Sequence, residues 1–534
     1  MIQHLLRKLG HLASDAALRR WLLERALGRT PAPPAFTPHR PPYLNALELG
    51  QTPHSDQSFA RLAVQAPQAP INLDLAGLDV AIEPAQAGAI FERPFDDIEQ
   101  LLALHRFAWI DDGTDPDWVA LLWSEWRQRF STLDESWPWH PYTAAERAIN
   151  LLAFAERRSL PEPADETRRL LVLHATIIAE RLEYFGPHYT GNHLANDGRG
   201  LFRLGTALGW SAAADLGGRI LLEEAKRIFG ASGVLIEGSA HYHLLLAKNY
   251  GEAASWAAKA ARPEAAELAA IAAKAKHAAG GLLLTGGLPL IGDISPDLPP
   301  RQLTSHFQRT DADLSADGWH RFEEGDWSLL LYAAPDGWPP MPGHGHQDLG
   351  SFELHWKGVP LIVDPGRGRY GDSGEAALYR SAAVHNGIIF DGRDPRPANR
   401  PYYAPSFRKA FAGAEPQVTS AEKGFSLSFP MDKTIVTRRF ETKSETLIIA
   451  DRIEGRGHRR IERGLVTPHP VTLSKNAASI HTPKGDIHLQ ADLTLEAMPI
   501  TCWNAYGRAS AASRLVAAGK ACLPWQGLLT LRTI

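Results

Sequence analysis

A change of hydrophobic period near residue 315 constrains the fold of this 534-residue chain more than any other feature. From about residue 96 to 310, apolar residues recur at three- and four-residue steps between short Gly or Pro breaks, which predicts successive helices. After about residue 320, apolar and polar residues alternate, as in SFELHWKGVPLIVD, which predicts antiparallel strands with turns at Gly and Asn. The chain is also too long for one ordinary core. The sequence therefore predicts an α+β multidomain protein, with a helical domain before a β domain.

The pattern divides the chain into residues 1–95, 96–315 and 316–534. The first 29 residues are basic and helical in pattern, and charges interrupt every apolar run, so we see no signal-peptide core. We expect this amphipathic helix to pack on the protein, with a membrane-surface role as the alternative. Residues 30–95 are Pro-rich and predict an irregular arm. The many helix pairs of residues 96–315 favour a toroid of antiparallel hairpins over a compact bundle.

Composition excludes several classes of protein. Fifty-six Lys and Arg against 60 Asp and Glu give a net charge of -4, which argues against a nucleic-acid partner. The longest uncharged apolar window is too short for an integral membrane segment. Two cysteines, Cys502 and Cys522, are too few for a disulfide scaffold, and we favour buried thiols over a single bridge. A cytoplasmic location is favoured, with a periplasmic one as the alternative.

The segment His344-Gly-His346-Gln-Asp348 is the best candidate for chemistry. It places two histidines and an aspartate within five residues, just before a predicted strand. In an extended chain, residues two apart face the same side, about 6.5 Å from each other. His344 and His346 can thus line one cleft. The alternative is a chance cluster among the 22 histidines of the chain.

Six motifs together resemble the heparinase II/III-type polysaccharide lyases, from about Leu104 to the C-terminus. They are LHRFAWI (104–110), WPWHPYTAAERAINLL (137–152), GNHLANDGRGLF (191–202), LIEGSAHYHLL (235–245), GHGHQDLGSFELHWKGVPLIVDPG (343–366) and YRSAAVHNGIIFDG (379–392). The resemblance implies an N-terminal incomplete (α/α) toroid followed by a C-terminal antiparallel β-sandwich, with the active cleft between them. It also implies β-elimination on a polysaccharide with 4-linked uronic acid, which gives unsaturated uronate ends.

Elimination needs a base for the C5 proton, an acid for the leaving oxygen at C4, and a donor that neutralises the uronate carboxylate. The resemblance assigns Asn192 as the neutralising amide, Tyr242 as the catalytic tyrosine and His344 as its acid/base partner. A phenol can be the base if nearby cations lower its pKa, and its protonated form can be the acid. The plain alternatives are a helix N-cap for Asn192 and a core aromatic for Tyr242.

The resemblance also implies one structural Zn²⁺ per chain, held by His346, Asp364 and His385. The intervals of 18 and 21 residues place these ligands on separate strands, unlike a short zinc finger. Two imidazoles and one carboxylate suit Zn²⁺. The metal would pin neighbouring strands and leave the elimination to other groups. Asp348 is expected to make hydrogen bonds at the strand start.

Other polar and aromatic residues near these motifs are candidates for binding the polymer. Arg199 could place a cation in the cleft or form a surface ion pair, and Glu237 could orient a donor or bridge the domains. Tryptophan faces stack on pyranose rings, although core packing is an equal alternative for the Trp cluster. The full substrate-binding set is His193, Arg199, His241, Glu237, Trp139 and His140.

Two other functions remain open from the sequence. A glycoside hydrolase on a helical toroid needs paired carboxylates, which do not recur in a pairable pattern here. A non-catalytic glycan-binding protein of exopolysaccharide or capsule biosynthesis would keep the fold and the zinc, but Asn192, Tyr242 and His344 together weigh against it. The balanced charge favours a polymer with little or no sulfate. The sequence leaves open whether the chain forms a homo-oligomer.

Overall fold

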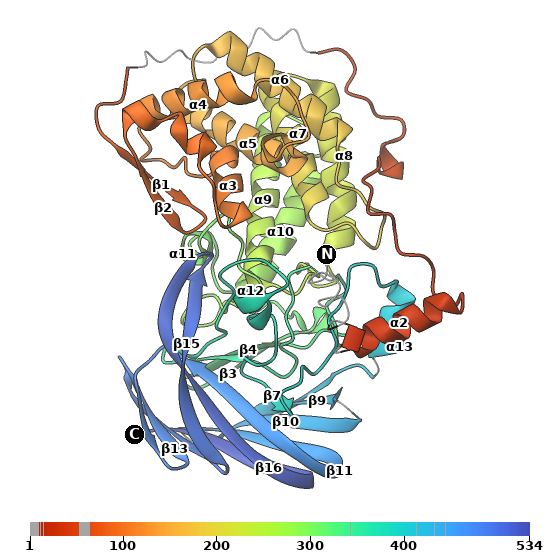
Figure 1. Cartoon of the computed structure of the whole chain (residues 1–534), viewed down its shortest axis with the longest axis vertical. Helices are drawn as coiled ribbons and strands as arrows, with labels where there is room; N and C mark the ends of the chain where they lie inside the picture. Colours follow the sequence, from red (N-terminus) through yellow and green to blue (C-terminus); the bar gives the residue numbers. More distant parts are fainter. Residues whose placement is uncertain are drawn as a thin grey trace.

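The computed structural model describes the whole chain except residues 1–9, 11, 14, 53–64, 342, 413, 432 and 444. Figure 1 shows a helical region joined to a sheet region, in the order that the change of period predicts. No helix among the described residues is long and apolar enough to span a bilayer. Cys502 and Cys522 are not bridged, and Cys502 is buried whereas Cys522 is exposed.

The helical domain is a series of antiparallel helix pairs. Its inner helices pack in sequence, α3 on α5, α5 on α7 and α7 on α9, and α6, α8 and α10 each pack on the helix before them. Side chains of Asp97, Asp115 and Ser239 cap α3, α4 and α9. The helices are α3 (Ile98–Arg106), α4 (Pro116–Phe130), α5 (Pro141–Arg157), α6 (Ala164–Glu180), α7 (His193–Leu208), α8 (Ser211–Ile228), α9 (Ala240–Lys259), α10 (Ala265–Leu282) and the short α11 (Pro300–Thr304).

The N-terminal part contains more structure than an irregular arm. Of the helix predicted over residues 1–29, positions 1–9, 11 and 14 lie outside the described residues. The described part contains α2 (Ala16–Ala26), which packs through Ala17 and Trp21 on α13 (Pro405–Ala412) of the β domain. A hairpin of β1 (Ile71–Leu75) and β2 (Leu78–Ile82) follows the arm. The sequence reading missed it because both strands are only five residues long, inside a Pro-rich region.

The β domain consists of two antiparallel sheets that share one apolar core. The smaller sheet has the order β3-β4-β5-β6, and the larger has the path β12-β13-β14-β16-β11-β10-β9-β8, with β15 on β16 and β7 on β11. The strands are β3 (Trp319–Glu324), β4 (Trp327–Tyr332), β5 (Glu353–Trp356), β6 (Val359–Ile362), β7 (Ile388–Phe390), β8 (Gln417–Ala421), β9 (Gly424–Met431), β10 (Thr434–Lys443), β11 (Thr446–Thr467), β12 (Val471–Ser474), β13 (Ala477–Thr482), β14 (Gly485–Ala491), β15 (Thr494–Ala505) and β16 (Arg508–Thr533), with α12 (Gly374–Leu378) between β6 and β7. The predicted two-domain fold is confirmed.

Candidate active site between the domains

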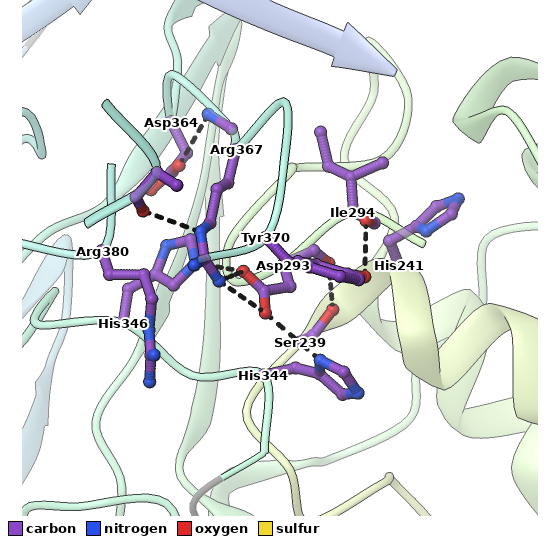
Figure 2. Close-up of polar contacts among 12 residues, drawn as sticks. Ser239, His241, Asp293, Ile294, His344, His346, Asp364, Arg367, Tyr370 and Arg380 are labelled. Carbon is purple, nitrogen blue, oxygen red and sulfur yellow. Dashed lines mark hydrogen bonds and ion pairs between the residues drawn. The ribbon is translucent and has the colours of Figure 1, made fainter. Parts of the chain in front are cut away.

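The candidate site forms where the starts of α7 and α9 meet loops of the β domain. Asn192 directly precedes α7, and Tyr242 lies in the first turn of α9. The Ser239 hydroxyl accepts the Tyr242 backbone N–H at 3.1 Å and donates to the Asp293 carbonyl at 2.7 Å, which ties α9 to the segment after α10. His344 enters from the loop between β4 and β5 (Figure 2). The two domains therefore share the site.

Tyr242 and His344 form a stacked pair across the domain boundary. Their ring centroids are 3.6 Å apart and the ring planes differ by 7°. Tyr242 is 7% exposed, so the pair is largely shielded from water. The geometry places one phenol and one imidazole side by side, as an acid and a base for one substrate would be.

The Tyr242 hydroxyl lies 2.5 Å from that of Tyr370, which in turn donates to the Ile294 carbonyl at 3.0 Å. Because Tyr370 gives its proton to that carbonyl, Tyr242 donates to Tyr370. Burial, followed by the charge of Asp297, raises the pKa of Tyr242 well above its usual value. The condition under which the phenol could be the base, a pKa lowered by nearby cations, is therefore not met, and Tyr242 carries its proton in the free protein.

Asp293 is the residue around which the β-domain loop is organised. Its carboxylate contacts His344 Nδ1 at 3.2 Å, His346 Nε2 at 2.9 Å and Arg367 Nη1 at 2.9 and 3.2 Å (Figure 2). Burial opposes ionisation, but the histidine hydrogen bonds and the Arg367 charge outweigh it and hold the pKa of Asp293 well below its usual value. His344 and His346 thus share a side, as their spacing predicts.

Asp293, Arg367 and Tyr370 were not predicted from the sequence, and each lies outside the six motifs. The one local signal for Asp293 is the preceding Gly292, which has φ +83°. A Cβ there would lie 2.4 Å from the Gly238 carbonyl oxygen, so only glycine allows this close approach to α9. A Gly-Asp pair in a connector marks a turn in many proteins and does not indicate a partner 51 residues away.

Asn192 and Glu237 lie on the α-domain side of His344. Asn192 occupies the N-cap position of α7, yet its side chain does not cap the helix and has no hydrogen bond with any described residue. Arg227 donates to the carbonyls of Thr190 and Gly191 and fixes the approach to Asn192. Glu237 Oε2 is 3.4 Å from His344 Nε2, and the Glu237 carbonyl accepts the His344 backbone N–H at 3.2 Å. The role of Glu237 as a bridge between domains agrees with these contacts.

His193 and His140 lie around the carboxylate of Glu183. Glu183 Oε1 is 3.0 Å from His193 Nδ1 and 3.6 Å from His140 Nε2. Burial alone would lower the pKa of His193, but the Glu183 charge and hydrogen bond outweigh it and raise that pKa. The His193 ring packs on Tyr142, whose hydroxyl donates to Asp297 at 2.9 Å. Both histidines keep some exposure, so both can contact a ligand.

Three residues of the predicted substrate-binding set are buried elsewhere. Trp139 is fully buried, donates to the Phe130 carbonyl and packs on Trp126, so it belongs to the core. His241 is also fully buried and accepts the Ser295 N–H at 3.0 Å. Arg199 is 5% exposed and forms a buried ion pair with Glu146 and Glu252, so it is neither a free cleft cation nor a surface ion pair. Neighbouring elements cover these three residues. The periodicity of one segment does not show which of its sides a neighbour will cover.

The three predicted metal ligands do gather. Each of His346, Asp364 and His385 offers a ligand atom, and these atoms lie within 4.8 Å of one another in a buried cluster. His385 Nδ1 is 2.9 Å from Asp364 Oδ2. The other ring nitrogens, His346 Nδ1 and His385 Nε2, are buried and have no hydrogen-bond partner among the described residues. Unpaired buried nitrogens are costly, and a cation would satisfy them.

Asp348 was expected to make hydrogen bonds at the strand start, and its backbone carbonyl does accept the Ser351 N–H at 2.7 Å. Its Oδ2 is buried without a partner in the described part of the chain. Burial raises the pKa of Asp348 to about 7, with His385 lowering it and Asp364 raising it. Asp348 therefore lies in the electrostatic surroundings of the cluster.

Known proteins resemble this chain in its C-terminal sequence and in its fold. Residues 308–513 match the family described as heparinase II/III-like, C-terminal. A heparinase III structure superposes with a TM-score of 0.65 at 15% identity, over 83% of this chain and 78% of the other. A second heparinase III gives 0.59 at 16% identity, over 83% and 80%. A heparan sulfate lyase mutant from Pedobacter heparinus gives 0.55 at 16%, over 83% and 77%. No curated protein sequence matches significantly.

Proposed function

The C-terminal part of this chain is heparinase II/III-like, and from that premise we propose that the protein is a polysaccharide lyase that cleaves a 4-linked uronic acid-containing polymer by β-elimination. The observation that supports this most strongly is the stacked pair of Tyr242 and His344, which brings a phenol and an imidazole from two domains to one point. Neither group alone would distinguish a lyase from a packing contact.

In the proposed reaction, His344 takes the C5 proton of the uronate. Ionised Asp293 accepts the Nδ1 proton of His344, which leaves the Nε2 lone pair to act as the base. Tyr242, which carries its proton, donates to the leaving oxygen at C4. The electron pair of the C5–H bond forms the C4=C5 double bond as the C4–O bond breaks.

Charge develops on the uronate carboxylate as the proton leaves, and we assign Asn192 to stabilise it. Its amide is the free polar group at the start of α7 and is not used in capping. An amide donor binds the developing dianion without titrating, so it favours the enolate-like state over the ground state. The positive end of α7 adds to this effect.

A structural zinc ion is part of the proposal. His346, Asp364 and His385 would hold it, and the unpaired nitrogens of the two histidines fit that role. The ion would join the β4–β5 loop, the end of β6 and the segment before β7. Asp293, which accepts from His346 Nε2, orients that ligand in the same way that it orients His344.

A screen of purified protein on uronate polymers tests the proposal. The expected result is a rise in ultraviolet absorbance from the conjugated double bond on at least one polymer, and its loss in the Tyr242→Phe protein. A hydrolase would shorten a polymer without that absorbance, and a non-catalytic protein would bind without shortening it. Either outcome would overturn the proposal.

A further inference from the structure

A large pocket adjoins the candidate site, and the N-terminal arm forms one of its walls. The pocket has a volume of about 830 Å³ and shares His140 and Glu183 with the site. Its other walls are the end of α6 with the connection that follows it, within residues 179–185, and an arm segment within residues 36–49. Figure 1 shows this part of the chain rising from α2 along the side of the helical domain, near α8.

The arm is fixed to the helical domain at both ends of this wall. The His39 N–H donates to the Tyr184 carbonyl at 2.9 Å, and the Tyr43 hydroxyl donates to Glu224 at 2.9 Å. Leu44 is fully buried in the helical core. At the far end, the Trp210 indole donates to the Leu49 carbonyl at 2.9 Å. These contacts make the wall a built part of the fold.

Phe36 places an aromatic face at the rim of the pocket. It is 40% exposed although it is large and apolar, and it has φ +49°, which bulky residues rarely adopt. Its ring is tilted against that of Phe185 and edge-on to that of Tyr189, with ring centroids 6.4 and 6.2 Å away. Phe36 therefore presents an exposed aromatic face at the pocket rim, of the kind on which a sugar ring can stack.

Carboxylates of the pocket outnumber its free cations. Glu183 is 9% exposed, and its Oε2 is buried without a partner among the described residues. Glu48 and Glu180 are exposed on the pocket wall, and neither has an ion-pair partner in the described chain. Of the pocket's two arginines, Arg181 is paired with Glu135 at 2.9 Å, whereas Arg40 donates to the carbonyls of Leu44 and Leu47. One guanidinium charge therefore faces the carboxylates of Glu48, Glu180 and Glu183.

We propose that this pocket binds a sugar unit of the polymer that carries a free, protonated amine. The proposal rests on the lyase function only for placing that sugar on the same polymer as the uronate. The exposed carboxylates of Glu48 and Glu180 supply acceptors for an ammonium group, the buried carboxylate of Glu183 adds negative charge behind them, and Phe36 supplies a face for the ring. A sulfate in the same place would meet carboxylates and be repelled.

Binding to the Tyr242→Phe protein, whose turnover should be reduced on the order of 10²–10⁴-fold, tests the pocket separately from catalysis. The probes are three uronate–glucosamine oligosaccharides of equal length, with a free amine, an N-acetyl group or an N-sulfate. Calorimetry should show the free-amine form binding about tenfold more tightly than the N-acetyl form, and the N-sulfated form most weakly. Adding Glu48→Gln and Glu180→Gln together should reduce the amine preference roughly threefold or more. Glu267→Gln on α10, an exposed carboxylate outside the pocket, should leave it unchanged.

Equal or tighter binding of the N-acetyl or N-sulfated form would overturn the proposal. So would an amine preference that survives the Glu48→Gln/Glu180→Gln change, or no binding of any probe. Phe36→Ala should weaken all three probes by a similar factor, because stacking does not depend on the nitrogen substituent. Failure of the lyase function would show separately, as the absence of unsaturated product from the unmodified protein.

Discussion

His344 is held on three sides, and this restraint supports the role of base that we propose for it. Asp293 contacts its Nδ1, the Tyr242 ring covers one face, and its backbone is bonded to Glu237 and Asp293. A fixed imidazole loses little entropy when substrate binds, so its position can be matched to the reacting proton.

Tyr242→Phe and His344→Ala should each reduce kcat by on the order of 10²–10⁴-fold, because each removes one proton-transfer group. Steady-state kinetics on a uronate polymer that the unmodified protein cleaves measure this, and circular dichroism checks the fold. Phe preserves the stacking but removes the hydroxyl that bonds Tyr370. Near-normal turnover in either variant would remove that residue from the mechanism.

Asn192→Ala should lower kcat much more than it raises KM. The amide matters most when charge builds on the carboxylate, so its loss raises the transition state more than the bound ground state. The α7 helix should survive, since the side chain does not cap it. A defect confined to KM would instead make Asn192 a uniform binding residue.

Buried histidines predict how the stability of the helical domain depends on pH. Burial lowers the pKa of His241 and of His243 to about 4. Below about pH 6.5 the unfolded chain takes up protons that the folded chain refuses. The contribution of these two histidines to the free energy of unfolding is therefore fully present above about pH 6.5. It is lost as the pH falls toward 4, by roughly 1.4 kcal/mol per pH unit for each histidine.

His243→Gln isolates one share of this effect, since His243 bonds the Leu235 N–H and the Ala275 carbonyl away from the site. Denaturant unfolding at pH 6.5, 5.5 and 4.5 should give a slope smaller by about 1.4 kcal/mol per pH unit than in the unmodified protein. His458→Ala, an exposed histidine on β11, should not change the slope. An unchanged slope in His243→Gln would contradict the prediction.

The motifs predicted which residues gather at two places, but not which motif residues are buried, nor the contacts made over long stretches of chain. Tyr242 and His344 lie together as predicted, and His346, Asp364 and His385 form one cluster. The burial of Trp139, His241 and Arg199 depends on which helix covers each side, which the sequence of one helix does not contain. Asp293 acts across 51 residues and has only a glycine turn as its signal.

At the scale of elements, the proposed zinc site joins segments that the sheets alone do not hold together. His385 lies just before β7, which pairs with β11 over only three residues. His346 lies in the long loop between β4 and β5. Ligands from separate segments form a site only in the folded state, so metal binding adds to folding stability.

His385→Ala, or removal of metal by a chelator, should lower the melting temperature of the β domain by roughly 5–10 °C, as expected for a loss of about 2–3 kcal/mol in a domain of this size. Scanning calorimetry measures this, with His458→Ala as the control. Elemental analysis should find about one zinc per chain in protein purified without chelator. No metal, together with unchanged melting of His385→Ala, would show that the three residues are only a polar cluster.

The order of helices before strands could be predicted, because the helical period before about residue 310 and the alternation after about residue 320 are both long and regular. The β1–β2 hairpin could not, because two five-residue strands in a Pro-rich region carry little pattern. The pairing order of the larger sheet was also beyond prediction, since β14 neighbours β16 and β7 pairs with β11 across long stretches of chain.

At the scale of the whole molecule, tyrosines bind the two domains together at the site. Tyr370 of the β domain contacts Tyr242 of the helical domain, and Tyr506 accepts the Tyr370 N–H and donates to Asp97, the cap of α3. The order of domains followed from the change of hydrophobic period, but their contact did not, because no periodicity describes the facing of two domains. The proposed chemistry depends on that contact.

The ratio of new double bonds to new reducing ends tests the central claim most directly. The unmodified protein is given an intact uronate polymer that it cleaves. Ultraviolet absorbance and the concentration of reducing ends are then measured on the same samples. β-Elimination makes one unsaturated uronate for every bond broken, so we expect a ratio of about one throughout the reaction. A ratio near zero with rising reducing ends would mean hydrolysis and would contradict the account.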